Sequence, residues 1–374
     1  MAQDICIFLF SLTALAVLYI MNNVPAFQEP MVVLEIGVAV LIVVFFLVYL
    51  ATRLNPPKDV FFYVFAEFSF TCIIDLVSAM EYDGFASGFM EFYQKTGEPY
   101  LGTSYAIMMC YWDGIAHFLM YLVMVRRMSK KKPYRNLGLF WAGSLVGNMV
   151  VFVAGIVVGK YGMELRPAFW LNMPFLLVPM WGAVSFFRRP RDPTTVTLAK
   201  IERKHKVSLL CRPFDMLLVL GLCAAMAFTL FRGLVVLGCP LEEFTSYTTL
   251  YEPYLNDPVA YPKVMMLCFL FYALPLLGSF VYGLWTPGCT WMLDWTVFVA
   301  GAMTQCQWSH IGASLHSRTA EIYHIPPSSL VPVLLANVMY AAVPLLLARR
   351  CTGNPAFFMT AATLTQSNNE KKVN

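Results

Sequence analysis

Long runs of apolar residues alternate with short polar segments along the whole chain. An α-helix needs about 20 residues to cross a bilayer core about 30 Å thick, and these runs have that length. We therefore predict an all-α polytopic membrane protein with about ten transmembrane helices. The expected helices cover 5–22, 31–52, 60–82, 105–126, 136–158, 165–187, 214–238, 264–285, 290–312 and 329–348.

Composition agrees with a chain that lies mostly in lipid. Of its 374 residues, 59% are hydrophobic and only 13% are charged, and its mean hydropathy is +0.64. A soluble domain does not bury so large an apolar share. The segment before the first run, "MAQD", carries an acid and no Lys or Arg, so we expect an uncleaved helix rather than a signal peptide. The ten cysteines show no metal-ligand spacing, and we expect neither a metal nor a cofactor.

The basic residues predict how the chain is oriented. With a cytosolic N-terminus and ten alternating helices, 20 of the 26 Lys and Arg residues fall on the cytosolic side and five on the lumenal side. The positive-inside rule therefore predicts that both termini are cytosolic. The clusters at 126–135 and 188–212 are explained first as topology determinants. We expect no nucleic-acid partner.

The four-residue word "EPYL" occurs twice, starting at Glu98 and at Glu252. If these words are aligned, "FTCIIDL" at Phe70 falls against "FTLFRGL" at Phe228, and both blocks follow the same order of helices and loops. We predict two parallel four-helix repeats, in which EPYL marks the return from the lumen into the membrane. The predicted segments are a hairpin at 1–55, repeats at 58–187 and 214–350, a basic linker at 188–213 and a tail at 351–374.

The two predicted repeats differ in their intramembrane charges. The first has Asp75 and Asp113, with His117 one turn after Asp113, whereas the second has Gly233 and either Phe269 or Leu270 at the matching places. Acids in a membrane helix are costly and mark function or a specific pair. Two interpretations remain open. In one, the acids line a ligand pocket with Trp112 as an aromatic wall; in the other, they form a buried ion pair with Arg232, which lies at a similar depth. The two do not exclude each other.

The four-helix block resembles the EXPERA domain of the emopamil-binding sterol isomerase, the sigma-2 receptor and the transmembrane 6 superfamily. The stretches that carry this resemblance are "GFMEFYQKTGEPYL", "CYWDGIAHFLMYL", "YRNLGLFW", "GKYGMELRPAF", "LFRGLVVLGCP", "YEPYLNDPVAYPK" and "SHIGASLHSRT". The tandem arrangement is typical of the transmembrane 6 superfamily, and "GFMEFY" and "LFRGLVVL" favour its member associated with hepatic lipid.

This resemblance implies a function in lipid metabolism. It implies an endoplasmic reticulum protein that influences triglyceride-rich lipoprotein lipidation and lipid-droplet content, with a sterol or other lipid bound at Asp75, Asp113, Trp112 and His117. One alternative is a sterol isomerase, for which Asp75, Asp113 and His117 are the catalytic candidates. However, Ala79 and Met80 stand where the isomerase relatives place a second catalytic group. Another alternative is a non-catalytic scaffold that recruits lipid-assembly proteins.

The end of the chain suggests where the protein resides. Lys371 and Lys372 stand four and three places from the carboxyl end of "NNEKKVN". This arrangement resembles a dilysine retrieval signal, which the coat of retrograde Golgi transport binds. We therefore expect the endoplasmic reticulum membrane as the main compartment, with the ER–Golgi intermediate compartment as a second one.

Overall fold

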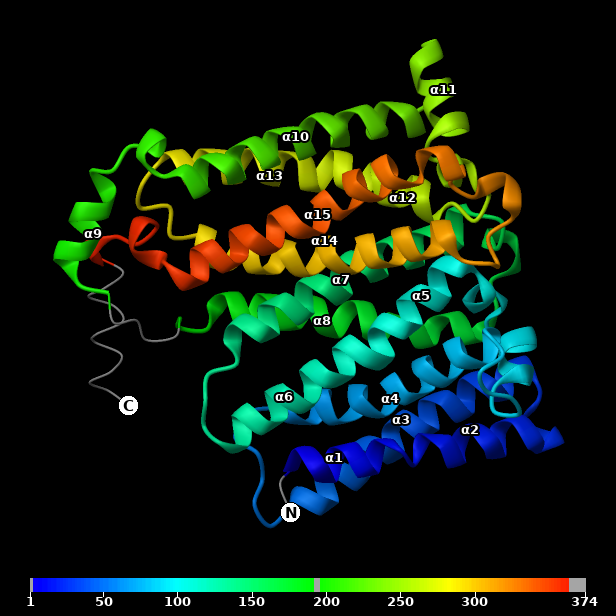
Figure 1. Ribbon diagram of the computed structural model, residues 1–374. Helices are drawn as coiled ribbons and strands as arrows, with labels where there is room; N and C mark the ends of the chain where they lie inside the picture. Colours follow the sequence, from blue (N-terminus) through cyan, green and yellow to red (C-terminus); the bar gives the residue numbers. More distant parts are fainter. Residues whose placement is uncertain (1–2, 192–195, 363–374) are drawn as a thin grey trace. The chain divides into compact units, whose positions relative to one another are not determined.

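The computed structural model describes residues 3–191 and 196–362, and within them it is helical throughout (Figure 1), with no strand. This confirms the predicted all-α class. Nine helical segments in the described residues are long and apolar enough to cross a membrane, and they coincide with nine of the ten predicted runs. These segments are Gln3–Asn23, Pro30–Thr52, Phe61–Tyr82, Ser104–Ser129, Arg135–Val158, Pro167–Arg188, Pro213–Val236, Tyr261–Trp285 and Glu321–Gly353.

The tenth predicted run, 290–312, also folds as one long helix, α14 (Met292–Leu315). Its mean hydropathy is too low for a candidate membrane span, because its second half carries polar side chains. Gln305, Gln307 and His310 are all buried. Their burial means that protein, rather than lipid, surrounds this part of α14, which agrees with its polar sequence.

The contacts divide the described residues into two compact units. Unit 1 consists of 1–137, 156–178 and 308–319, and unit 2 consists of 138–155, 179–307 and 320–374. These units interleave along the chain, whereas the predicted repeats are consecutive. The predicted repeat boundaries therefore remain a prediction.

Unit 1 is built around α4 (Phe61–Tyr82). Five helices pack against α4: α1 (Gln3–Ser11), α2 (Ala14–Asn23), α3 (Pro30–Thr52), α5 (Ser104–Trp112) and α6 (Phe118–Ser129). The sequence explains this central place because α4 carries buried aromatic residues on several faces, among them Phe61, Phe65 and Phe70. By contrast, α3 is almost wholly apolar yet mostly exposed, as expected for a helix that faces lipid.

Unit 2 is centred on α10 (Pro213–Val236), which packs against four further helices. These are α11 (Glu242–Leu250), α12 (Tyr261–Cys268), α13 (Leu274–Trp285) and α15 (Leu330–Gly353). The short helix α9 (Leu198–His205) packs against the turn Pro355–Phe357. The remaining long helices of the chain are α7 (Arg135–Val158) and α8 (Met173–Arg188).

Within unit 2, α7 and α14 approach each other through small residues. The sequence "GSLVG" places Gly143 and Gly147 four residues apart on one face of α7. A Cβ atom on Gly143 would lie 1.9 Å from the carbonyl oxygen of Phe298, and one on Gly147 would lie 2.7 Å from Cβ of Ala302. Such small-residue spacing lets membrane helices pack backbone to backbone. Close to this contact, the Ser144 hydroxyl donates a hydrogen bond to Gln305 Oε1 at 2.7 Å.

The two EPYL words adopt the same local structure. Each starts a short 3₁₀ turn, Pro99–Gly102 in one case and Pro253–Asn256 in the other. The glutamates before these turns have nearly equal backbone angles, with φ −137° and ψ 76° at Glu98 and φ −129° and ψ 68° at Glu252. Proline at the next position disfavours the helical region and explains this geometry. The word therefore has one conformation in both places.

Candidate functional site

Three carboxyl groups gather in unit 1. Asp75 projects from α4, Asp113 starts a π-helical turn (Asp113–His117) between α5 and α6, and Glu98 precedes the first 3₁₀ turn. A π-turn in a helix is rare, and unit 2 has one at the matching place, Phe269–Ala273 between α12 and α13. Asp75 lies within electrostatic range of both Asp113 and Glu98.

Asp113 has a partner on its own turn. Its Oδ1 lies 2.7 Å from Nδ1 of His117, and the Trp112 indole Nε1 donates a hydrogen bond to His117 Nε2 at 3.3 Å. The Trp112 ring also contacts Trp308, with 5.9 Å between ring centroids. Because Nε2 of His117 accepts a hydrogen bond, its Nδ1 carries the proton that faces Asp113. Trp112 and His117 therefore hold Asp113 in position.

Glu98 is buried and is surrounded by hydrogen-bond donors. The hydroxyl of Tyr93 donates to its Oε2 at 2.5 Å, and the Tyr100 hydroxyl and the Asn172 amide donate to Oε1. Burial raises the pKa of Glu98 above its ordinary value, and these three hydrogen bonds oppose the rise. In the sequence, Glu98 stands out only as part of the repeated word, and no local pattern indicates its donors.

Asp75 differs from both of these acids. Its side chain is partly exposed although it lies deep in an apolar helix, and among the described residues it has no hydrogen-bond or ion-pair partner. Two buried thiols, Cys72 and Cys110, lie within its electrostatic range. A carboxyl group that no protein donor satisfies is costly in a membrane helix. Of these three acids, Asp75 is therefore the one that the described residues leave without a hydrogen bond.

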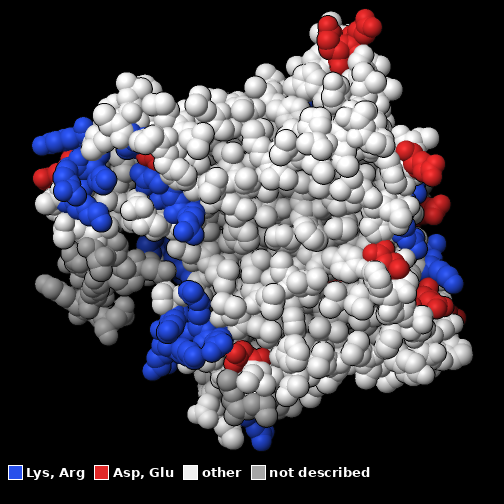
Figure 2. Space-filling model, viewed as in Figure 1, with Lys and Arg blue, Asp and Glu red and all other residues white. Residues whose placement is uncertain are grey.

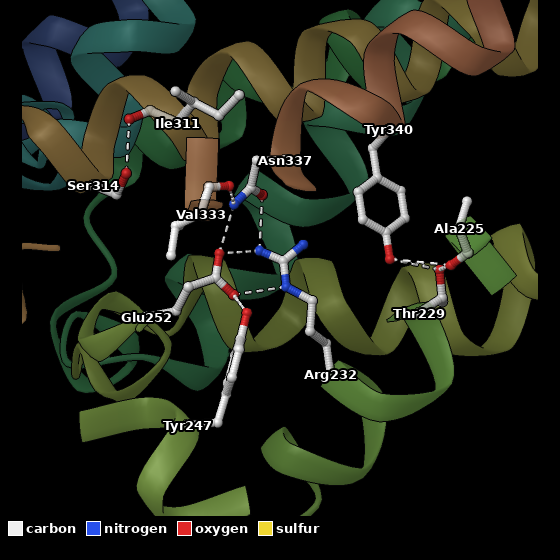
Figure 3. A network of polar contacts seen from close by, with 10 residues as sticks. All are labelled: Ala225, Thr229, Arg232, Tyr247, Glu252, Ile311, Ser314, Val333, Asn337 and Tyr340. Carbon is white, nitrogen blue, oxygen red and sulfur yellow. Dashed lines mark hydrogen bonds and ion pairs between the residues drawn. The ribbon is translucent and has the colours of Figure 1, made fainter. Parts of the chain in front are cut away.

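Unit 2 contains a matching cluster with different chemistry, shown in Figure 3. Glu252 accepts hydrogen bonds from the Tyr247 hydroxyl at 2.6 Å and from the Asn337 amide at 2.7 Å, as Glu98 does from Tyr93 and Asn172. Here, however, a fully buried guanidinium is added. Arg232 Nε lies 2.7 Å from Glu252 Oε2, and Arg232 Nη2 lies 2.8 Å from Asn337 Oδ1. The second cluster is therefore neutralised by an arginine of its own chain.

The ion pair that the structure shows for Arg232 is thus with Glu252. Depth along the sequence had suggested an aspartate of the first repeat as its partner. The Arg232 guanidinium also lies 4.7 Å from the Phe228 ring centroid and 5.6 Å from that of Tyr340, which adds cation–π attraction. A signal for this cluster was present in the sequence: Tyr stands five residues before Glu in both copies, at 93 and 247.

In unit 2, a leucine side chain packs against the position that corresponds to Asp75. In unit 1 the close contact lies between Gly114 and Leu76, where an added Cβ would come within 2.6 Å of Leu76 Cβ. In unit 2 the glycine of the close contact is Gly233, which lies on α10, the helix that corresponds to α4. A Cβ on Gly233 would lie 2.7 Å from Leu270 Cδ1. Since Gly233 aligns with Asp75, the Leu270 side chain occupies space near the place of the missing carboxyl group.

The two predicted retrieval residues, Lys371 and Lys372, lie outside the described residues. The described part of the tail contains the aromatic segment around Phe357 and Phe358, both of which are buried. The Arg212 guanidinium lies 3.8 Å from the Phe357 ring centroid, and Arg350 bonds to Asp215 through Nε at 2.6 Å. These contacts fix the chain just before the last residues.

Comparisons with known proteins give a consistent picture. A family model described as "Transmembrane 6 superfamily member 2-like, transmembrane domain" matches residues 13–197. The chain is 45% identical to transmembrane 6 superfamily member 2 of Mus musculus over 97% of this chain and 96% of that protein. The corresponding proteins of Rattus norvegicus and Homo sapiens are 46% and 45% identical, over 94% and 93% of this chain and 93% and 92% of their own lengths. No solved structure matches.

Proposed function

Because the chain belongs to the family of transmembrane 6 superfamily member 2, we propose that it is an endoplasmic reticulum protein that regulates lipid metabolism, and that a sterol or another lipid binds in unit 1. The regulated process is the lipidation and secretion of triglyceride-rich lipoproteins, together with lipid-droplet content. The resemblance to the transmembrane 6 superfamily supports this process, and the resemblance of the EXPERA block to sterol-binding relatives supports the lipid ligand.

The observation that carries the proposal is the contrast between Asp75 and Arg232. Unit 2 satisfies its buried carboxylate with its own guanidinium, whereas unit 1 keeps a partly exposed carboxyl group that has no hydrogen-bond or ion-pair partner within 3–191 and 196–362. A lipid with a hydroxyl or other hydrogen-bond donor would satisfy Asp75, and its apolar body would lie among the side chains of the bundle. Asp113 and Glu98 would shape the site electrostatically.

Sterol isomerisation is the second candidate. It requires a group that protonates an alkene carbon and a base that removes a neighbouring proton. The cluster offers carboxyl groups for both roles, because Glu98 is buried and Asp113 is held by His117. This reaction would extend the proposed binding function and would use the same residues.

Photo-crosslinking of the purified full chain with a sterol probe tests the binding proposal. We expect label on α4 or α5, competition by unlabelled sterol, and weaker labelling of Asp75→Asn. Label confined to other helices, or equal labelling of the variant, would refute the site. Incubation with a sterol diene then separates binder from enzyme, since only an isomerase shifts the ring double bond.

If no sterol probe labels the chain, a scaffold for lipid-assembly proteins remains. Such a scaffold would retain its protein partners in Asp75→Asn, as measured by co-purification of crosslinked complexes. A binder whose partners depend on ligand would lose them in the same variant.

A further inference from the structure

The turn that follows α6 concentrates positive charge at one end of unit 1. Arg126, Arg127, Lys130, Lys131 and Lys132 are all exposed within seven consecutive residues. The ion pair found at this turn joins Arg126 Nε to Asp4 at 4.0 Å, the limit for such a contact. The three lysines have no acidic partner among the described residues. In Figure 2, Lys and Arg side chains gather where Figure 1, in the same view, draws the C-terminal end of α6.

The backbone of this turn is fixed rather than loose. The Lys132 amide donates to the Arg127 carbonyl at 2.8 Å, and the Lys131 amide donates to the Met128 carbonyl at 3.0 Å. Arg127 Nη1 also donates to the Pro133 carbonyl at 2.8 Å. This pair of backbone bonds forms a helix C-terminal motif that holds three successive lysines in one arrangement.

Lys131 occupies a position that usually favours glycine. Its φ is +52°, in the left-handed region, where a Cβ atom is strained. Other positive-φ positions of the described chain carry glycine, at 84, 88, 238 and 288, and Ala260 is the second exception. Glycine would adopt this conformation without strain, yet the position carries a lysine. We take this as an indication that the lysine side chain has a function.

The surface of α6 leading to this turn is apolar. Leu119 and Val123 have 57% and 43% of their surface exposed, and helical spacing places them on the face that continues to Arg126 and Lys130. An apolar stripe that ends in clustered cations fits an amphiphile with an anionic head. A free phosphate ion would gain nothing from the stripe.

We propose that the turn Arg126–Lys132 binds the headgroup phosphate of an anionic phospholipid whose acyl chains lie along Leu119 and Val123. The predicted orientation places this turn at the cytosolic leaflet, where anionic lipids are found. Because the turn is already fixed by its backbone bonds, little ordering is needed on binding. This site is independent of the carboxyl cluster around Asp75.

Photo-crosslinking in nanodiscs tests the site. The full chain is placed in phosphatidylcholine that contains a small fraction of a photoactivatable phosphatidylserine, and the labelled peptide is mapped. We expect label between 115 and 135. Replacing Lys130, Lys131 and Lys132 together by Ser should lower labelling by about 100-fold, because each basic residue near the surface adds to the attraction.

A matched triple variant controls for net charge. Lys200→Ser, Arg203→Ser and Lys204→Ser remove the same charge from α9, where these residues are also exposed. This variant should leave the labelling at 115–135 unchanged. An equal loss in both triples would show nonspecific attraction and overturn the site. Full competition by soluble glycerophosphoserine at low concentration would show a free-anion site and overturn the lipid assignment.

A single substitution separates binding from folding. Lys131→Gly removes one charge and relieves the left-handed strain, so it should weaken labelling several-fold while the thermal midpoint stays equal or rises. Unchanged labelling in a folded Lys131→Gly protein would refute the role of that side chain. Because this variant is not expected to misfold, the proposal remains testable even if the triple variant is unstable.

Discussion

Arg232 of α10 and Glu252 of the second EPYL turn form a fully buried ion pair in which guanidinium Nε lies 2.7 Å from the carboxylate Oε2. Glu98, at the same place in the first EPYL turn, receives its hydrogen bonds from Tyr93, Tyr100 and Asn172 instead. Glu252 is thus balanced by a cation of its own chain, whereas Glu98 is held by neutral donors and interacts electrostatically with Asp75. This difference separates a structural cluster from a candidate binding site.

Loss of Arg232 should destabilise the protein strongly. Arg232→Leu would leave Glu252 as a buried charge without its guanidinium partner, and breaking such a pair costs about 3–5 kcal/mol. We expect a sharp fall in abundance and in thermal midpoint. The double variant Arg232→Leu with Glu252→Gln should recover part of the loss, because no uncompensated charge remains. Normal abundance of the single variant would contradict the structural role.

The two aspartates of unit 1 should respond differently to the same change. Asp75→Asn keeps the shape of a side chain that has no hydrogen-bond partner among the described residues, so abundance should stay near normal while sterol-probe labelling falls. Asp113→Asn weakens the 2.7 Å contact with His117 and should lower the free energy of unfolding by about 1–3 kcal/mol. Abundance should therefore fall. Labelling is measured per folded molecule. Equal loss of abundance in both variants, with normal labelling, would rule out the ligand role.

Gly143 should not tolerate a side chain. Gly143→Val would place its Cβ 1.9 Å from the Phe298 carbonyl oxygen, and backbone cannot move aside as a flexible side chain can. We expect α7 and α14 to separate and the protein to be degraded, as measured by detergent-solubilised abundance. Gly278→Ala is the control, because its nearest contact is the Met226 methyl carbon at 3.4 Å. Wild-type abundance of Gly143→Val would show that this contact is wrong.

The predicted orientation can be tested with engineered glycosylation sites. A sequon placed near Glu243 on α11 should be modified, because this segment is predicted to face the lumen. Another placed near Lys200 on α9 should remain unmodified. Both segments carry exposed residues, so access to the enzyme is comparable. The reverse pattern would invert the topology.

The terminal lysines should determine the compartment. Replacing Lys371 and Lys372 by Ser should shift the protein from the endoplasmic reticulum toward the Golgi, because the coat would no longer bind the tail. Immunofluorescence against compartment markers measures this shift. Lys200→Ser with Lys204→Ser is the matched control, since it removes the same charge elsewhere. An unchanged location would leave the tail lysines without a sorting role.

The sequence by itself determined the helices of this protein. Apolar runs of membrane-spanning length are a local property, since each run must satisfy its backbone hydrogen bonds internally in lipid. The repeated EPYL word likewise fixed its own turn, because proline restricts the preceding glutamate wherever the pair occurs. The tenth run also forms a helix, α14. Its polar residues do not tell from the sequence whether lipid or protein surrounds it.

Only the tertiary structure decided which polar groups meet. The position of a residue along a helix gives its depth in the membrane but not the direction in which its side chain points. Depth alone therefore suggested an aspartate as the partner of Arg232 and could not indicate Glu252. Asn337 and Glu252 are 85 positions apart, and Asn172 and Glu98 are 74 apart, so no local pattern joins them. The π-turn at Asp113 adds a further rotation that helical periodicity does not predict. Side-chain partnerships in this protein therefore depend on how the helices pack.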